Sequence, residues 1–305
     1  MGYCDDTSGL WRTLKRMDGG LPLNRLSAPL GSANAVLRAR SRTHFVREFA
    51  GPLSIKCVTE GAVAWKCAGR DRLVDRDSFL VLDAGEPYSM AIDSRHPVAT
   101  LCVFFRAGFV ESVQASLAGS ALEEEYLPLP FPGGLHSRDE RILPRMHAIA
   151  ESGIGDRLWL DEQYLLLARD LVRLNGEIER RVDRMPARRP ATRAELFRRV
   201  RRGQEYLHAS ACADPDLAEI ARAACLSPYH FHRAFARAFG ATPHEYRNRL
   251  RLHRARRLLE TGGMTVTETC AAVGFASAPS FSNLFRKTFG VPPSALRPPK
   301  ISKTR

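Results

Sequence analysis

Short apolar runs alternate with turn-forming residues through the first third of the chain, after a lead-in at residues 1–30 that we interpret as a tail. Gly, Asp and Glu separate the runs, a pattern typical of β-strands joined by tight turns. The runs lie at 53–59, 62–67, 79–82, 88–92 and 98–105. Strands at this spacing predict a small antiparallel barrel or sandwich, which we place at residues 31–115.

A helical period replaces the strand pattern after a stretch rich in Pro and Gly at residues 128–134. Between about 138 and 180, apolar residues recur at three- and four-residue steps, which predicts two amphipathic helices. Their apolar stripes fit packing on the barrel or on a second copy of the chain, and we interpret residues 116–182 as a helical dimerisation segment. The Arg-rich residues 183–194 contain two prolines and are the best linker candidate.

The carboxy-terminal third is helical throughout and repeats itself at an offset of 50 residues. Several pairs of positions carry the same residue, and the upstream helices align when the offset is reduced by one. The pairs are Ser227/Ser277, Phe231/Phe281, Phe235/Phe285, Phe239/Phe289, Gly240/Gly290, Pro243/Pro293 and Arg247/Arg297. Chance does not give so many matches at one offset, so the repeat indicates a duplicated structural unit.

Each copy has the pattern of a helix-turn-helix. A short apolar helix, at about 217–224 or 266–273, is followed by a break and then by a second helix. Ser227 and Ser277 are N-cap candidates for the second helix, each with a proline close behind. Phenylalanines four residues apart form one stripe on that helix, which predicts that it is held against the first helix by aromatic packing.

A linker helix joins the two copies. Thr242-Pro243-His244-Glu245 fits a capping box at its start, and Gly262-Gly263 ends it. Its roughly 18 residues span about 27 Å, which suits two recognition helices in consecutive major grooves about 34 Å apart. Arginines along it are predicted to follow the DNA backbone rather than to read bases. They are Arg247, Arg249, Arg251, Arg254, Arg256 and Arg257.

Polar side chains remain on the outer face of each second helix once the phenylalanines point inward. Groups in the amino-terminal half of such a helix reach base edges, and basic groups one turn later meet phosphates. The predicted base contacts are Tyr229, His230, His232, Arg233, Pro279, Ser280, Ser282 and Asn283. The predicted backbone contacts are Ser227, Arg237, Arg247, Ser277, Arg286 and Lys287.

The charge distribution supports double-stranded DNA as the partner of this third of the chain. From Pro190 onward there are 20 Lys and Arg against 8 Asp and Glu, compared with 46 against 33 in the whole chain. Clustered basic residues favour a polyanion, and residues 299–305 add a short basic tail. No apolar run approaches the about 20 residues of a membrane span, and the start of the chain lacks the pattern of a secretory leader. We therefore expect a cytoplasmic protein without a membrane partner.

Cysteine and histidine spacing argues against a metal or disulfide framework. The seven cysteines are scattered and form no Cys-x-x-Cys pair, which predicts reduced thiols. A histidine metal site in a small barrel needs a His-x-His and a nearby Glu so that the ligands converge on one ion, whereas His44 and His96 each stand alone. We expect no metal, no cofactor and no catalytic residue.

Residues 195–298 resemble the AraC/XylS family of bacterial transcription regulators. The resemblance rests on the helix-turn-helix at 217–239, the Gly-Ala-Thr-Pro turn at 240–243, the Val-Gly-Phe at 273–275 and a closing series of spaced residues. That series is Phe281, Phe285, Phe289, Gly290, Pro293 and Arg297. It implies an α+β chain, with a cupin-like amino-terminal β-barrel and a helical dimerisation segment, followed by an all-α domain of two helix-turn-helix units joined by a linker helix.

The resemblance also implies a function and a set of contacts. Members are sequence-specific regulators, more often activators that contact RNA polymerase, and commonly homodimers. Base contacts are implied at Tyr229, His232 and Arg233 in the first unit and at Pro279, Ser282 and Asn283 in the second. Many relatives have arginine where Asn283 stands, a departure that leaves the base choice of the second unit open.

The barrel resembles the sensor domain that many members carry, through the Asp-Ala-Gly-Glu-Pro-Tyr turn at 83–88. This implies a small-molecule effector, for which His44, Trp65, Tyr88 and Phe104 are the candidate lining residues. Two alternatives stay open. A cupin-type enzyme fused to a DNA-binding module needs converging metal ligands or a cysteine beside a base. A ligand-independent DNA-binding protein predicts a barrel filled by its own side chains.

Overall fold

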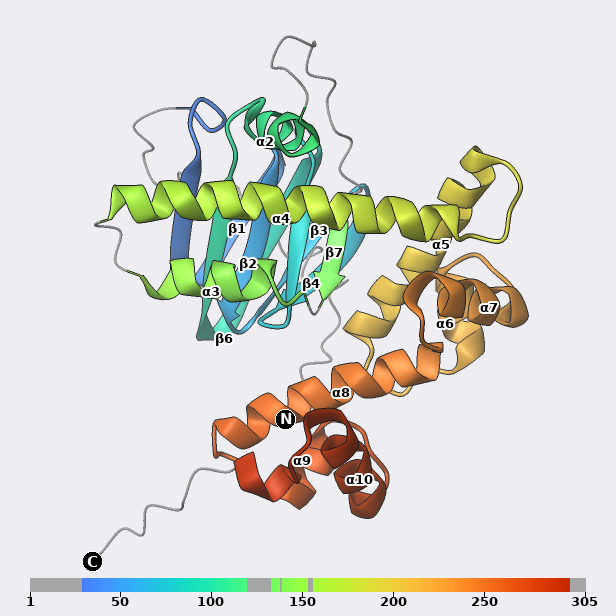
Figure 1. Ribbon diagram of the computed structural model, residues 1–305. Helices are drawn as coiled ribbons and strands as arrows, with labels where there is room; N and C mark the ends of the chain where they lie inside the picture. The colour runs from blue at the N-terminus through green and yellow to red at the C-terminus, as the bar shows by residue number, and fades with distance from the viewer. Residues whose placement is uncertain (1–28, 120–132, 138, 153–155, 297–305) are drawn as a thin grey trace, which may run out of the picture. The chain divides into compact units, whose positions relative to one another are not determined.

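The chain forms two compact units. The computed structural model describes residues 29–119, 133–137, 139–152 and 156–296. The first unit ends at Arg180 and the second begins at Arg181. Every described strand belongs to the first unit, and the described part of the second unit is helical (Figure 1).

Seven antiparallel strands form the sheet in the described part of the first unit. They are β1 (Ala35–Ala50), β2 (Ser54–Glu60), β3 (Ala62–Cys67), β4 (Arg70–Asp75), β5 (Ser78–Leu82), β6 (Pro87–Phe104) and β7 (Gly134–Ser137). Their order is β4-β3-β6-β2-β5-β7, with β1 along the other edge of β6. The first half of β6 pairs with β3 and its second half pairs with β2, so the long β1–β6 ribbon is shared by both halves of a nearly closed barrel. The predicted antiparallel barrel is confirmed.

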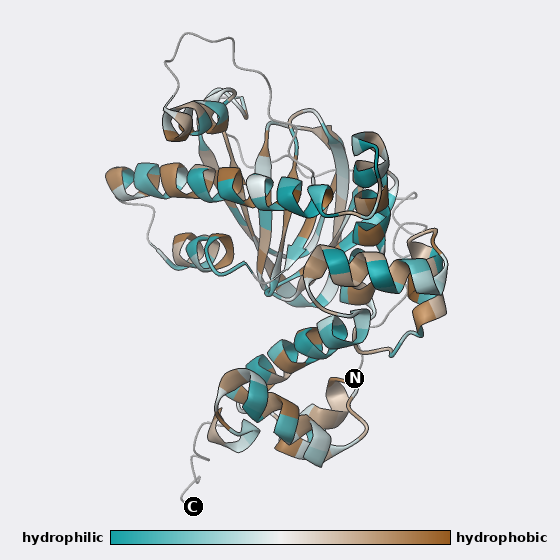
Figure 2. Cartoon of the chain, turned by 45° about the vertical axis from the view of Figure 1, so that its right-hand side comes forward, coloured by the Kyte–Doolittle hydropathy of each residue, from teal (hydrophilic) through white to brown (hydrophobic). Residues whose placement is uncertain are grey.

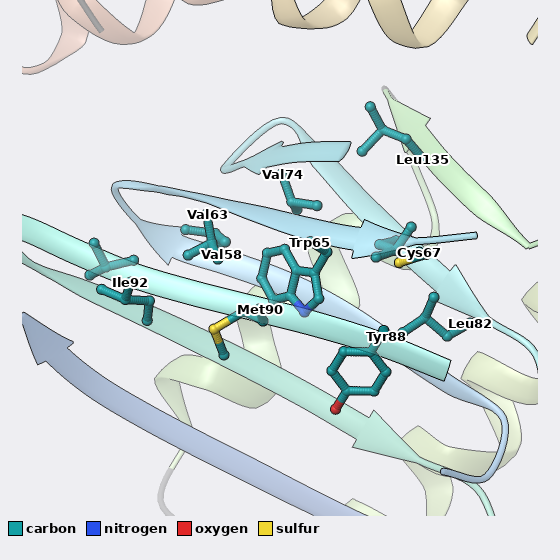
Figure 3. Close-up of a cluster of buried hydrophobic side chains, with 12 residues drawn as sticks. Val58, Val63, Trp65, Cys67, Val74, Leu82, Tyr88, Met90, Ile92 and Leu135 are labelled. Carbon is teal, nitrogen blue, oxygen red and sulfur yellow. The ribbon is translucent and has the colours of Figure 1, made fainter. Parts of the chain in front are cut away.

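The barrel interior is packed with apolar side chains from most of its strands. One core cluster joins Val58 of β2, Trp65 of β3, Val74 of β4, Leu80 of β5 and Met90 of β6 (Figure 3). Because successive side chains on a strand point to opposite faces, the residues between these positions lie on the outer face. The outer face of β2, β5 and β6 is also buried, which explains why these strands lack a simple apolar–polar alternation.

Helices cover the outer face of the barrel. Helices α3 (Ile142–Glu151) and α4 (Arg157–Asp183) run across one side of the sheet in Figure 1, and both show alternating apolar and polar turns in Figure 2. Helix α2 (Phe109–Ala118) follows the last long strand. Among the described helices, none is both long enough and apolar enough to cross a membrane.

The structure refines the predicted segment boundaries. The two amphipathic helices predicted between 138 and 180 are confirmed as α3 and α4. However, residues 116–182 are not wholly helical, because β7 lies among them and pairs with β5. A four-residue strand is too short to give a periodic signal in the sequence. Likewise, the linker predicted at 183–194 is shorter, because a helix already begins at Pro190, where proline fits a first helical turn.

The described part of the second unit consists of two helix pairs and two further helices. Its elements are α5 (Pro190–Ala209), α6 (Leu217–Ala223), α7 (Pro228–Phe239), α8 (Pro243–Glu260), α9 (Val266–Ala272), α10 (Ala278–Phe289) and the 3₁₀ turn η1 (Pro293–Leu296). Helices α6 and α9 start 49 residues apart, whereas α7 and α10 start 50 apart. The second pair therefore has one more residue in its turn, which is the change of offset seen in the sequence.

Close packing behind α7 gives a test of this unit's core. A methyl group at Gly203 of α5 would overlap the ring of Phe231, which is fully buried. We expect Gly203→Ala to lower the free energy of unfolding by about 1–3 kcal/mol, because overpacking outweighs the helical preference of alanine. Gly176→Ala in α4 is the matched control, since the new methyl would meet only Arg180 Nη1 at 3.6 Å. Urea unfolding of both variants measures the difference, and equal stability would contradict the packing argument.

Candidate nucleic-acid interface

Helices α7 and α10 are held from behind by stripes of aromatic side chains. Phe231 and Phe235 of α7 are fully buried, with ring centroids 5.3 Å apart. Phe281 and Phe285 of α10 are equally buried and lie 5.5 Å apart. Rings of this size contribute much of the burial energy of a small unit, so the inward face of each helix is fixed. The predicted aromatic stripe is confirmed at these four positions, whereas the third phenylalanine of each stripe, Phe239 or Phe289, is half-buried.

The start of each helix is fixed by the serine predicted to cap it. Ser227 Oγ accepts a hydrogen bond from the backbone N–H of His230 at 3.3 Å, and Ser277 Oγ accepts one from Ser280 at 3.4 Å. The turn before each helix contains a residue with positive φ, Cys225 at 53° and Gly274 at 83°. Cap and turn together determine where each helix begins and which way its first turn faces.

The outer face of α7 presents a row of polar side chains. Tyr229 is 68% exposed, and His230, His232 and Arg233 are also exposed. Arg233 Nη1 donates a hydrogen bond to the Tyr229 hydroxyl at 3.0 Å, and its guanidinium lies 5.5 Å from the centroid of the same ring. This pairing restricts both side chains before any partner arrives. Donors, acceptors and an aromatic ring are thus collected on one helix face.

The outer face of α10 is less charged near its start. Pro279, Ser280 and Asn283 are exposed, and Ser282 is half-buried. The basic residues predicted as phosphate contacts, Arg286 and Lys287, are exposed in the last turn. The amino-terminal half of α10 therefore offers hydroxyl and amide groups but no cation.

Several arginines predicted to contact phosphates have partners within the chain. Arg237 donates from Nε to the backbone oxygen of Arg184 at 2.9 Å, although its side chain stays exposed. Arg247 forms an ion pair with Asp214 at 2.6 Å and donates to the backbone oxygen of Pro215 at 3.1 Å. Burial lowers the pKa of Arg247, and Asp214 partly opposes that effect. Arg247 thus fastens α8 to the α5–α6 loop.

Arg251 is the centre of this attachment. It is 4% exposed, donates from Nε to the backbone oxygen of Ala211 at 2.6 Å, and pairs with Asp214 at 3.1 Å. Its guanidinium also lies 5.8 Å from the ring centroid of Phe275, in the second helix-turn-helix. A Cβ on Gly274 would come within 3.2 Å of the Arg251 guanidinium carbon. We name Arg247, Arg251 and Asp214 the arginine clamp.

Two further arginines of α8 that are predicted to follow the DNA backbone also have partners within the chain. Arg254 donates to Cys212 Sγ at 3.4 Å, and Arg256 pairs with Glu260 at 2.8 Å while lying over the ring of Phe289. Arg257 is half-buried, whereas Arg249 is exposed. The sequence of α8 contains many arginines and does not show which of them face inward and which face solvent. The arginine clamp was not predicted for that reason.

Three of the four candidate effector residues lie in the interior of the first unit. Trp65 is fully buried, Phe104 is 2% exposed and Tyr88 is 7% exposed. Figure 3 shows Trp65 and Tyr88 in the interior cluster. His44 is half-buried on β1 opposite Ile92, and burial lowers its pKa. Close to these rings lies Lys56, a buried residue that the sequence did not single out.

The described residues give little support to metal or thiol chemistry. No group of three His, Cys, Asp or Glu side chains among them could hold a metal ion. The described cysteines form no disulfide with one another, and Cys4 lies outside the described residues. Burial raises the pKa of Cys57 to about 12 and also raises that of Cys102, which disfavours the nucleophilic thiolate.

Two family models match the chain in agreement with this architecture. The AraC-like ligand binding domain matches residues 35–167, and a helix-turn-helix domain matches residues 220–298. The chain belongs to the AraC/XylS family. The expected combination of a cupin-like ligand-binding domain with a double helix-turn-helix domain is confirmed.

Named relatives of this AraC/XylS chain share part of its length. It is 38% identical over 78 residues to the transcriptional regulator GbdR of Pseudomonas aeruginosa. The matched stretch covers 26% of this chain and 21% of GbdR. It is 42% identical over 78 residues to the transcriptional activator RhaS of Escherichia fergusonii, which is 26% of this chain and 28% of RhaS. It is 38% identical over 71 residues to the bifunctional transcriptional activator and DNA repair enzyme AdaA of Bacillus subtilis, which is 23% of this chain and 34% of AdaA.

The arginine clamp gives a second test. Arg251→Met removes the donor to the buried carbonyl of Ala211, so we expect the free energy of unfolding to fall by about 1–3 kcal/mol. Arg249→Met is the matched control on the same helix and should change stability by no more than about 0.5 kcal/mol, because Arg249 is exposed. Denaturant unfolding checks both. If the two substitutions were equally costly, the clamp would not be what joins α8 to the loop.

Proposed function

We propose that this AraC/XylS-family protein is a sequence-specific, DNA-binding transcriptional regulator. The observation that carries the proposal is the pair of short helices, each fixed by buried phenylalanines, that present polar side chains outward. Such a helix, with its amino-terminal residues free, is the element that helix-turn-helix proteins place in the major groove. The charge of this unit suits a polyanionic partner, because the chain's excess of basic residues lies in it.

Helix α7 is proposed as the main reader of bases. A guanidinium such as that of Arg233 reads guanine through its O6 and N7 acceptors, while Tyr229, His230 and His232 supply further donors and apolar contact. Helix α10 is proposed to read bases through Ser280, Ser282 and Asn283 beside Pro279. The contact of α10 with DNA is expected to be weaker than that of α7, since the basic residues of α10 lie only in its last turn.

The positioning contacts to phosphates are proposed at a reduced set of residues. Arg237, Arg286, Lys287 and Arg249 are exposed, and backbone N–H groups at the helix starts beside Ser227 and Ser277 add to them. Arg247 is not needed for this role, because Asp214 and Pro215 already engage it.

The first unit is proposed to sense a small molecule and to mediate self-association. The matched ligand-binding model supports the sensor role. For self-association, α4 exposes Leu158 (82%) and Leu165 (51%), which are seven residues apart and therefore share one face. Exposed leucines at this spacing favour a helix partner from a second copy.

The regulator is proposed to be cytoplasmic and to activate transcription through RNA polymerase. RhaS, one of the matched relatives, is named an activator, which favours activation over repression. We also propose that the chain is not an enzyme. AdaA, one of the matched relatives, is named a DNA repair enzyme as well as an activator. For this chain, burial of Cys57 and Cys102 favours a structural role for those thiols.

Selection from a random DNA library tests the DNA-binding proposal. We expect the full chain to enrich a defined motif at moderate salt, and Arg233→Ala to weaken binding to that motif by about 1–3 kcal/mol with little effect on random duplex. Arg198→Ala, an exposed arginine on α5, is the control and should leave the preference unchanged. Failure to enrich any motif would refute sequence-specific binding. Equal losses on both duplexes would make Arg233 a phosphate contact.

Light scattering tests the proposed self-association. We expect the wild-type chain to be a dimer and the double substitution Leu158→Glu with Leu165→Glu to be a monomer, because like charges replace apolar contacts on one helix face. Leu117→Glu, another exposed leucine of the first unit, is the control and should remain dimeric. A dimer that survives the double substitution would remove α4 from the interface.

A further inference from the structure

Lys56 of β2 is a buried ammonium group inside the barrel. Its side chain is 0% exposed, and Nζ has no hydrogen-bond partner among the described residues. Nζ lies 3.7 Å from the ring centroid of Phe104 and 4.8 Å from that of Tyr88. Lysine is almost never fully buried unless paired, so this position requires an explanation.

Strand geometry places Lys56 on the interior face of β2. Alternate residues of a strand share a face, so Lys56 lies on the same side as Val58, a member of the interior cluster. Its cross-strand neighbours are Leu80 of β5 and Cys102 of β6. Lys56 therefore points between the two halves of the barrel, away from the helices on the outer face.

The surroundings satisfy the charge of Lys56 only in part. The two ring faces attract a cation, but they replace neither hydrogen bonds nor a counter-ion. A second buried cation in the barrel shows the contrast, since Arg72 donates to the backbone oxygen of Cys67 and faces Glu86 at 4.0 Å. Desolvation lowers the pKa of Lys56 to about 8, although the nearby Cys102 and Cys67 act in the opposite direction.

We propose that Lys56 is the anchor for an anionic effector, a small organic monocarboxylate whose carboxylate pairs with Nζ inside the barrel. This inference rests on the proposed sensor role of the first unit and adds the chemical class of the ligand. A carboxylate supplies both the missing charge and the missing hydrogen-bond acceptors. One cation with apolar neighbours suits a single negative charge, whereas a phosphate dianion needs several donors.

The apolar part of the ligand has a matching environment. Tyr88, Phe104 and Trp65 provide ring surfaces in the same interior. Met90 belongs to the same cluster, and an unbranched methionine is the kind of side chain that repacks around a guest. The ligand is thus expected to carry an alkyl or aryl group of modest size.

Thermal shift and calorimetry on the full chain test the proposal. The probes are butyrate, hexanoate and phenylacetate, each paired with its neutral amide, and inorganic phosphate. We expect at least one carboxylate to raise the melting temperature, while its amide and phosphate do not. For that carboxylate, Lys56→Met should weaken binding at least about tenfold, the usual effect of losing a charge-assisted hydrogen bond. Lys66→Met, an exposed lysine on β3, is the matched control and should bind normally.

The variant also has a readout that needs no ligand. Methionine has a similar length but no charge, so ligand-free Lys56→Met should melt at a higher temperature than the wild-type chain. This result shows at the same time that the variant folds. The proposal is overturned if no carboxylate stabilises the wild-type chain beyond its amide, if phosphate stabilises equally, or if Lys56→Met binds as tightly as wild type. Failure of DNA selection with intact carboxylate binding would instead refute the regulator function alone.

Discussion

Burial of two phenylalanines per helix is the constraint on which the DNA-binding unit depends. Once Phe231 and Phe235, or Phe281 and Phe285, are fixed in the core, the helical period determines which residues face outward. The outward position of the polar residues on these helices therefore requires no further interaction. The same constraint explains why Gly203 is tolerated in the middle of α5, because the ring of Phe231 occupies the space that a side chain would need.

A second constraint connects the two helix-turn-helix units. The linker helix α8 is not an isolated rod, because the arginine clamp ties it to the α5–α6 loop. Arg251 also lies over Phe275 of the second helix-turn-helix. A buried guanidinium with several partners holds one geometry, whereas an exposed one does not. Arginines that serve this purpose are removed from the charge available to DNA. The formal charge of the unit therefore overstates the number of cations that phosphates can reach.

The sequence predicted the repeated features better than the single ones. The double helix-turn-helix, both serine caps and the Thr242–Glu245 capping box follow from local patterns that occur in a fixed order, and all are present. Strand β7 was missed because four residues carry no period. The clamp was missed because Asp214 is distant in sequence from Arg247 and Arg251. Lys56 was missed because a lysine within an apolar strand is ordinarily assumed to point toward solvent.

The buried charge of Lys56 destabilises the ligand-free barrel, and the same charge can make the barrel respond to a ligand. A ligand shifts a conformational equilibrium only when it binds the two conformations with different affinities. A barrel whose interior is wholly apolar and satisfied has little to gain from a guest beyond burial of its surface. An ammonium that lies against two rings and has no hydrogen-bond partner among the described residues has much more to gain, because an anion changes its electrostatic energy directly. That same ammonium also rejects neutral analogues of the ligand, since a neutral guest would leave the charge unpaired. Affinity and selectivity would then come from one residue whose presence makes the ligand-free barrel less stable.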